Sequence, residues 1–234
     1  MNQSVQVKGG DETKERILLA AQKLFAERGF EAVSLRKITT EALANVAAVN
    51  YHFGSKEALI DEVIVQHMMP VMKERMRLLD EAERQFQVGV VPVEVILDAF
   101  MRPFLTVMQE SGESRELFCK FMGRCMSERG DKLPDQAIRI VQKVVKRVTA
   151  MLSDALPEME PEVLSWRIHF CFGVMAHTLM HEDTLKIISK GLSGDPDFEM
   201  KLQRMIDYCK GGLEAGSSGL SANSNSGGQS EFFF

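Results

Sequence analysis

Apolar residues recur every three or four positions along most of the chain, a spacing that predicts helices rather than strands. Between residues 13 and 27 they form one stripe on a helix face, at Ile17, Ala20, Ala21, Leu24 and Phe25. No stretch of the sequence alternates apolar and polar residues between turn signals, so no sheet is predicted. We therefore expect an all-α protein.

Capping residues and glycines divide this pattern into separate helices. Ser34, Asn45 and Ser55 are each placed to cap the start of a helix, and Gly29 supplies a left-handed residue after the first one. These signals predict short helices over 34–41 and 45–52, then a longer helix from 55 towards 82 that bends near Pro70. Further helices are expected over 92–110, 114–128, 135–156, 160–189 and 196–211.

The segment 34–56 contains two short predicted helices joined by a tight turn, which is typical of a helix-turn-helix DNA-binding motif. Its second helix would leave Val46, Ala47, Asn50 and Tyr51 facing outward. Small apolar side chains let a helix approach base edges and contact thymine methyl groups, and the Asn50 amide suits N6 and N7 of adenine. Phosphate contacts are expected from Ser34, Arg36, Lys37, Tyr51, His52 and Lys56. A helical hairpin without any DNA-binding function would show the same spacing.

Residues 13–63 resemble the DNA-binding domain of the TetR family of transcriptional regulators. The matching sequence is RILLAAQKLFAERGFEAVSLRKIT, followed by NYHFGSKEAL. The form VAAVNYHFGSKEAL is similar to the PsrA-like subgroup, whose members respond to fatty acids or their thioesters. The resemblance implies an N-terminal three-helix DNA-binding domain with a helix-turn-helix, followed by a larger helical ligand-binding and dimerisation domain. It also implies a DNA surface made of Ser34, Arg36, Asn45, Ala47, Ala48, Asn50, Tyr51, His52 and Lys56.

The turn of the motif departs from the family pattern. Family members usually have Gly-Val there, whereas this chain has Leu43 and Ala44. A leucine with positive φ costs about 1–2 kcal/mol, because its Cβ crowds the following carbonyl. Either the turn is strained, or the backbone takes another path and the recognition helix docks at a changed angle.

The sequence predicts three parts: a DNA-binding domain over 1–56, a ligand-binding and dimerisation domain over 57–212, and a disordered Gly/Ser/Asn-rich tail over 213–234. All methionines except Met1 lie beyond residue 56. Methionines adapt to irregular apolar ligands, although a helical core would use the same residues. The predicted pocket is lined by Met68, Met72, Met76, Phe100, Phe104, Met108, Phe118, Phe121, Met122, Met126, Phe170 and Val174, with Arg124 facing an anionic group of the ligand.

Two segments near the C-terminus are expected to form a dimer interface. Gly173 and Ala176 permit close approach of helices, and residues 196–211 carry apolar side chains at helical spacing. A two-fold symmetric dimer would place its recognition helices about 34–36 Å apart, one turn of duplex, or a multiple of this distance. The predicted interface consists of Trp166, Phe170, Gly173, Ala176, His177, Phe198, Leu202, Met205 and Ile206.

Composition and charge restrict the function classes further. The net charge is −5, but residues 1–56 hold eight Lys/Arg against six Asp/Glu, so the predicted DNA-binding end is not acidic. The four cysteines are far apart and the sequence shows no export signal or membrane span, which indicates reduced thiols and a cytoplasmic protein without membrane contact. His177 and His181 have a spacing that can bind a metal, but no third ligand supports them. Because the sequence also lacks a nucleophile elbow, phosphate loop or dinucleotide motif, we expect no metal, no cofactor and no enzymatic activity.

These features together predict a homodimeric transcriptional repressor. It would leave its double-stranded DNA operator when an apolar small molecule such as a fatty acid or acyl-coenzyme A binds. A regulator of drug or xenobiotic response is one alternative, which acidic residues in the pocket would favour. A helical interaction module with a degenerate DNA surface is another.

Overall fold

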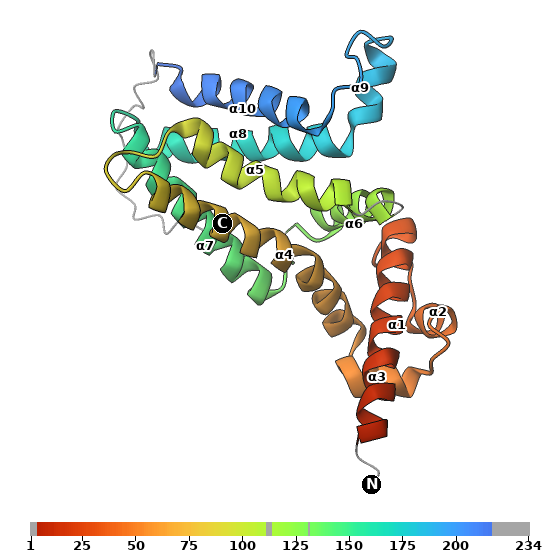
Figure 1. The fold of residues 1–234 in the computed structure, drawn as a ribbon. Helices are drawn as coiled ribbons and strands as arrows, with labels where there is room; N and C mark the ends of the chain where they lie inside the picture. Colours follow the sequence, from red (N-terminus) through yellow and green to blue (C-terminus); the bar gives the residue numbers. More distant parts are fainter. Residues whose placement is uncertain (1–3, 111–113, 131, 217–234) are drawn as a thin grey trace, which may run out of the picture. The chain divides into compact units, whose positions relative to one another are not determined.

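The computed structural model describes residues 4–110, 114–130 and 132–216. Every regular element in these residues is a helix, which confirms the predicted all-α class. The elements are α1 (Ser4–Arg28), α2 (Leu35–Glu41), α3 (Val46–Phe53), α4 (Lys56–Gln85), α5 (Val93–Glu110), α6 (Ser114–Glu128), α7 (Asp135–Ala155), α8 (Pro161–Met180), α9 (Glu182–Ile188) and α10 (Phe198–Glu214) (Figure 1).

Two helices differ most from their predicted bounds. The first, α1, begins at Ser4 rather than at residue 13 and includes Gly9 and Gly10, which have low helix propensity. The predicted helix over 160–189 is wrong as a single element, because the backbone leaves helical geometry at His181 (φ −127°, ψ 28°) and separates α8 from α9. The break at His181 is therefore additional to the one between the predicted helices over 160–189 and 196–211, which the structure shows between α9 and α10.

The chain divides into two compact units. Unit 1 comprises Met1–Val71 and Thr106–Ala137, and unit 2 comprises Met72–Leu105 and Ile138–Phe234. This division by packing differs from the functional division at residue 56, which stays a prediction. Of the expected tail, Leu213 is buried in α10, whereas residues 217–234, including Phe232, lie outside the described residues.

The core of unit 1 joins α1 to α2, α3 and α6 (Figure 1). The apolar stripe predicted on α1 is buried, and Ile17 and Phe25 are completely inaccessible. Phe30 extends this core, because its ring centroid lies 5.1 Å from that of Phe25 and 5.8 Å from that of Phe121 on α6. Each buried aromatic side chain contributes about 1.5–3 kcal/mol. These rings therefore fix α6 against the N-terminal helices.

One histidine lies among the aromatic residues of unit 1. The ring centroid of His67 on α4 is 4.8 Å from that of Phe121 and 6.0 Å from that of Phe118. Its Nδ1–H donates a hydrogen bond of 2.8 Å to the Val63 carbonyl. Burial lowers the pKa of His67 from its ordinary value of 6.5, while the bond to Val63 acts in the opposite direction. The neutral imidazole is therefore the form that the folded unit favours.

This shift predicts that the protein loses stability as the pH falls through the pKa of the unfolded histidine. Below about pH 6.5 the unfolded chain binds a proton that folded unit 1 resists, so the free energy of unfolding decreases. His67→Phe should flatten this part of the pH profile, which thermal unfolding by circular dichroism from about pH 8 to pH 5 would measure. Equal profiles for the wild type and the variant would contradict the assignment.

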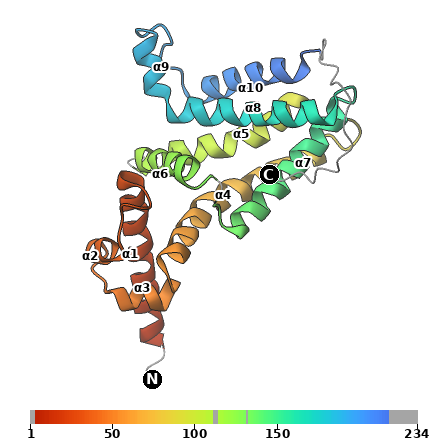
Figure 2. The same ribbon diagram turned by 180° about the vertical axis from the view of Figure 1, so that it is seen from behind.

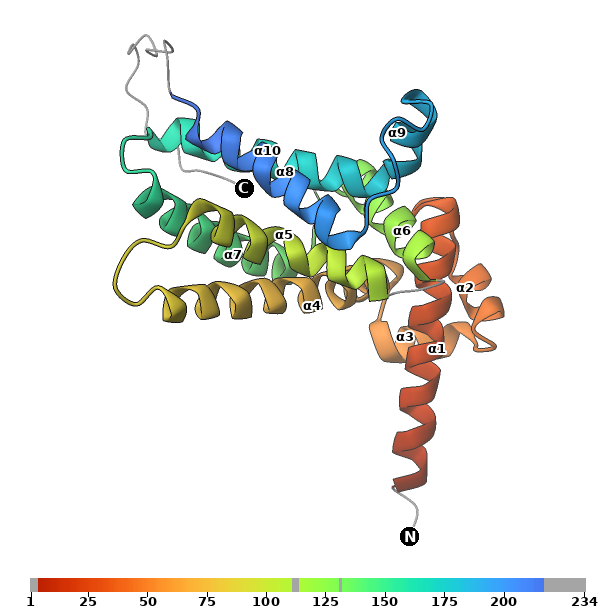
Figure 3. The same cartoon turned by 45° about the horizontal axis from the view of Figure 1, so that its top comes forward.

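Unit 2 contains the second part of α4 together with most of α5 and α7 and with α8, α9 and α10. Figures 2 and 3 show α8 and α10 side by side, and α9 at the end of α8. Ion pairs also connect helices of this unit: Arg147 of α7 lies 2.7 Å from Asp80 and 2.6 Å from Glu83, both on α4. Arg102 of α5 similarly pairs with Glu199 of α10 at 2.7 Å.

Candidate DNA-binding site

The turn between α2 and α3 is built around a leucine in the left-handed region. Leu43 has φ 51° and is 86% exposed. The Leu43 amide donates to the Thr40 carbonyl at 3.3 Å and the Ala44 amide to the Thr39 carbonyl at 2.9 Å, which is the hydrogen-bond pattern of a Schellman helix end. This pattern requires positive φ at the residue that usually is glycine. The strained turn is therefore the path that this chain takes.

We expect Leu43→Gly to raise the free energy of unfolding by about 0.5–1 kcal/mol, because relief of the left-handed strain exceeds the extra entropy of a glycine. Leu43→Ala is the matched control. It removes the same exposed side chain but keeps Cβ, and it should leave stability unchanged. Urea unfolding of the three proteins measures both effects, and an equal gain from alanine and glycine would refute the strain interpretation.

Side-chain caps position the recognition helix α3. The Asn45 Oδ1 accepts a hydrogen bond of 2.8 Å from the Ala48 amide, and Gly54 (φ 81°) ends the helix. Ser34 and Ser55 cap α2 and α4 in the same way. These contacts confirm the predicted caps. They also commit the side-chain oxygen of Asn45 to the helix, so only its amide nitrogen is free of that role.

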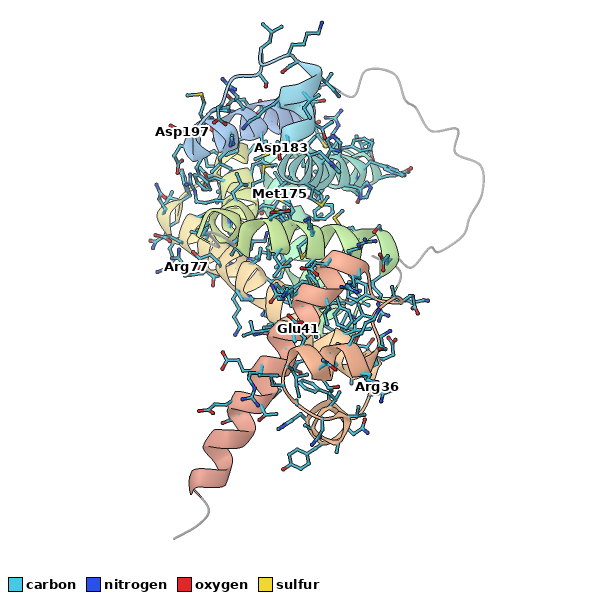
Figure 4. The ribbon with its side chains drawn as sticks, turned by 90° about the vertical axis from the view of Figure 1, so that its right-hand side faces the viewer. Arg36, Glu41, Arg77, Met175, Asp183 and Asp197 are labelled. Carbon is cyan, nitrogen blue, oxygen red and sulfur yellow. The ribbon has the colours of Figure 1, made fainter. Side chains whose placement is uncertain are left out.

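The residues predicted to contact DNA lie at the surface of unit 1. Tyr51 is 85% exposed and Val46 is 41% exposed, although both are largely apolar. Figure 4 shows Arg36 on the neighbouring helix α2. The exposed members of the predicted set are Ser34, Arg36, Lys37, Asn45, Val46, Ala47, Asn50 and Tyr51, and the half-buried ones are Ala48, His52 and Lys56.

The charges around this surface favour an anionic partner. Glu41 is neutralised by Lys23 at 2.7 Å, an interaction that lowers the pKa of the Glu41 carboxyl, and Glu57 is paired with Arg129 at 2.9 Å. Within the described part of the chain, Arg36 and Lys56 have no carboxylate partner. Arg36 on α2 and Lys56 directly after α3 are therefore available to phosphates of DNA.

The carboxylate of Glu128 on α6 accepts a hydrogen bond from the backbone that follows the end of α1. Glu128 Oε2 accepts a hydrogen bond of 2.9 Å from the Phe30 amide, and Glu128 Oε1 lies 2.7 Å from Arg124 Nη1. Gly29 (φ 80°) brings the backbone so near that an added Cβ would lie 2.7 Å from Glu128 Oε1. Sequence analysis did not identify Glu128, because a charged residue at a helix end usually faces solvent.

The predicted ligand-pocket residues separate into several environments. Phe118 and Phe121 belong to the core of unit 1, where Phe121 fills the space between Phe30 and His67, so the structure does not place them at an open surface. Arg124 is paired with Glu128, so its guanidinium already has an anionic partner. Met126 and Phe170 are exposed; Met68, Met72 and Phe100 are buried; and Met76, Phe104, Met122 and Val174 are half-buried. The side chain of Met108 lies outside the described residues.

Two surface hollows of unit 1 are lined by charged as well as apolar residues. One is lined by residues that include Asp61, Arg129 and Lys132, and the other by residues that include Glu27, Lys120 and Arg124. Arg124 is the one member of the predicted pocket that lines either hollow. They therefore differ in character from the predicted apolar pocket.

The most unusual cation of unit 2 was missed by sequence analysis. Arg75 on α4 is only 2% exposed, and its Nε donates a hydrogen bond of 2.7 Å to the Phe100 carbonyl on α5. The sequence did contain a signal for this burial, because Arg75 follows Met72 by three residues and precedes Leu79 by four, which places it on the apolar face of the helix.

The predicted dimer-interface residues also divide into two groups. Trp166 and Phe170 are 57% and 59% exposed, and Gly173 and His177 are exposed as well. Ala176, Leu202, Met205 and Ile206 are buried within unit 2, where α8 packs on α10 of the same chain, and Phe198 is half-buried. The outward face of α8 is therefore the part of the predicted interface that a partner could reach.

Neither a metal site nor a membrane span was found in the described part of the chain. The rings of His177 and His181 lie 4.8 Å apart, but no group of three potential ligands was identified among the described residues. None of the described helices is long and apolar enough to cross a membrane.

A helix-turn-helix with an exposed reading helix and unpaired cations, joined to a larger helical unit, defines a DNA-binding transcriptional regulator. Residues 17–63 match the family model of bacterial regulatory proteins of the tetR family, and residues 98–212 match the tetracyclin repressor-like C-terminal domain. The chain belongs to the TetR family of transcriptional regulators. Members of this family bind DNA operators, typically dimerise and bind small molecules, and they are not enzymes.

Relatives and solved structures agree with this assignment. The transcriptional regulator UidR of Escherichia coli (strain K12) is 24% identical over 183 residues, which cover 70% of this chain and 90% of UidR. The transcriptional repressor NicS of Pseudomonas putida is 38% identical over 60 residues, 26% of this chain and 28% of NicS. The fold is similar to that of the TetR family regulator PfmR from Thermus thermophilus, with a TM-score of 0.54, 18% identity and coverage of 85% of this chain and 97% of PfmR.

Proposed function

We propose that this chain is a homodimeric, cytoplasmic repressor that leaves its operator when an apolar small molecule binds, with a fatty acid or acyl-coenzyme A as inducer. The proposal rests mainly on the side chains at the outer surface of α2 and α3. Val46 and Tyr51 are exposed there beside the unpaired cation of Arg36. On DNA, the apolar side chains of this surface would contact base edges and its cation would contact phosphates, whereas in water the apolar side chains remain unfavourably exposed.

The choice of inducer is supported by the sequence form NYHFGSKEAL, which is similar to the PsrA-like subgroup, and by the methionines and phenylalanines of unit 2. Buried Arg75 disfavours a cationic drug, the alternative effector, because like charges repel each other strongly away from water. The sign of regulation follows NicS, which is named a repressor. The relative CecR of Shigella flexneri is named a dual regulator, which makes activation at some promoters the second possibility.

The proposed switch uses α4, which starts directly after the recognition helix and continues into unit 2. A ligand that binds better to one arrangement of α4 shifts the population towards that arrangement. A coupling free energy of about 1–3 kcal/mol would change operator affinity about 5–150-fold.

Selection of operator sequences from a random duplex library by the purified protein tests the DNA-binding proposal. We expect one enriched palindromic sequence. Affinity for it should fall steeply between about 50 and 200 mM salt, because the release of counterions from DNA on binding becomes less favourable as the salt concentration rises. Adding oleate or oleoyl-coenzyme A should then weaken binding. Failure to enrich any sequence would refute a DNA reader, whereas operator binding that neither compound changes would refute only the proposed inducer.

Sedimentation equilibrium tests the dimer. The wild type should sediment as a dimer, and Phe170→Glu on the outward face of α8 should yield monomers, because a buried unpaired carboxylate is costly. Val88→Glu is the control, since Val88 is fully exposed in a turn of the same unit. A monomeric wild type, or a Phe170→Glu variant that remains dimeric, would remove α8 from the proposed interface.

A further inference from the structure

Arg75 is a buried cation that has no carboxylate partner among the residues that the structure describes. Its guanidinium donates to the Phe100 carbonyl at 2.7 Å and lies 3.7 Å from the Met72 sulfur and 3.6 Å from the Met175 sulfur. The Phe100 ring covers it, with 4.3 Å between the guanidinium carbon and the ring centroid. All of these partners are neutral.

Other arginines of unit 2 show how unusual this is. Arg77, two residues away on the same helix, lies 2.7 Å from Glu74 and 2.9 Å from Glu81 at the surface. Arg147 and Arg102 likewise pair with carboxylates. Figure 4 labels both Arg77 and Met175, the latter being a neighbour of Arg75. Arg75 is more removed from water than these three arginines, yet unlike them it has no carboxylate partner among the described residues.

Burial of this charge is costly for the unliganded protein. Burial lowers the pKa of Arg75 from its ordinary value to about 9, so the guanidinium still carries its charge at neutral pH. A backbone carbonyl, two thioethers and a ring compensate only part of the lost hydration, since thioether sulfur is a weak acceptor. An arrangement that is costly without a ligand becomes favourable when an anion supplies the missing partner.

The surroundings of Arg75 would allow a carboxylate to replace the methionine sulfurs as partner of the guanidinium. The bond from Nε to Phe100 fixes one edge of the guanidinium, while both terminal nitrogens face methionine sulfurs. Methionine side chains are unbranched and flexible, so they can move aside at low cost. A carboxylate could then bind the terminal nitrogens, and the same methionines and Phe100 would contact the hydrocarbon chain that follows it.

We infer that Arg75 binds the carboxylate of the effector, which makes the effector a free long-chain carboxylic acid rather than its coenzyme A thioester. This inference rests on the proposed function as a ligand-responsive regulator. An acyl thioester has a neutral carbonyl at the position of the carboxylate. Its phosphates lie many atoms from the acyl chain, too far to reach a guanidinium enclosed by Met72, Phe100 and Met175. Arg75 therefore distinguishes between the two proposed inducers.

Binding measured by isothermal titration with four probes of equal chain length tests the inference: oleate, methyl oleate, oleylamine and oleoyl-coenzyme A. The full-length wild type should bind oleate in preference to the other three. Arg75→Met should weaken oleate binding by roughly 30-fold or more, because it removes the counterion and preserves the apolar bulk. Arg75→Lys should retain part of the affinity, and Arg77→Met, which changes an exposed arginine on the same helix, should retain all of it.

A second readout separates a binding role from a merely structural one. If Arg75 served only to join α4 to α5, Arg75→Met would lower the midpoint of thermal unfolding without ligand, and all probes would lose affinity equally. As an anion receptor, the variant should unfold at the same or a higher temperature than the wild type, and methyl oleate affinity should persist.

Three outcomes would overturn the inference: equal binding of oleate and methyl oleate by the wild type, unchanged oleate binding by Arg75→Met, or preference for oleoyl-coenzyme A. Each of them leaves the proposed regulator intact if operator release still occurs. If none of the four probes binds while the selected operator does, both the inference and the proposed inducer fail, but DNA reading stands.

Discussion

Asn50→Ala is expected to reduce operator affinity by about 1–3 kcal/mol, with the loss confined to one adenine of each half-site. Asn50 is exposed on α3, and its side chain takes no part in capping the helix. A bidentate contact to adenine N6 and N7 would therefore be lost without damage to the fold. Fluorescence anisotropy with the selected operator, and with operators that carry another base at the contacted position, measures the effect.

Asn45→Ala is the matched control for this prediction. Its side chain caps α3 by accepting from the Ala48 amide at 2.8 Å, so the substitution should cost about 1 kcal/mol of stability and weaken binding to all sequences alike. Lys56→Gln should likewise weaken binding uniformly and reduce the salt dependence by about one phosphate contact. If Asn50→Ala discriminated between bases as well as the wild type does, direct adenine reading by Asn50 would be wrong.

Local signals in the sequence were sufficient for most helices and for the DNA-binding motif. Ser34, Asn45 and Ser55 cap the helices they were predicted to cap, because a cap depends on atoms only three residues apart. The left-handed Leu43 was one of the two outcomes that the sequence allowed, since the departure from glycine lies in a turn whose geometry is local. The start of α1 was not foreseeable, because Gly9 and Gly10 oppose a helix there.

The sequence alone could not predict the roles of residues that depend on tertiary contacts. Arg75 and Arg129 are charged residues that sequence reading assigns to solvent by default, yet both are buried. On α8 the aromatic residues occur on more than one face, so the sequence could not tell which face turns towards α10. In the structure Ile168 and Cys171 are buried, whereas Trp166 and Phe170 remain outside.

The second large effect is expected from Glu128→Ala, which should lower the free energy of unfolding of unit 1 by about 2–3 kcal/mol. The carboxylate accepts the hydrogen bond of the buried Phe30 amide at 2.9 Å, so its loss leaves this donor unsatisfied in the core. Urea unfolding gives the total loss, and hydrogen exchange of residues 25–33 should show that it is concentrated at the end of α1.

Two comparisons identify which contact of Glu128 matters. Glu128→Gln keeps an oxygen that can accept from the Phe30 amide but removes the charge, so it should recover most of the stability. Arg124→Ala removes only the partly exposed ion pair at 2.7 Å and should cost less than about 1 kcal/mol. If Arg124→Ala were as destabilising as Glu128→Ala, the stability would come from the ion pair within α6 rather than from the hydrogen bond between the Phe30 amide and Glu128. Because α1 packs on both α2 and α3, the bond from the Phe30 amide to Glu128 makes α6 a structural part of the DNA-binding helices, whereas the ion pair lies within α6 and connects it to no other helix.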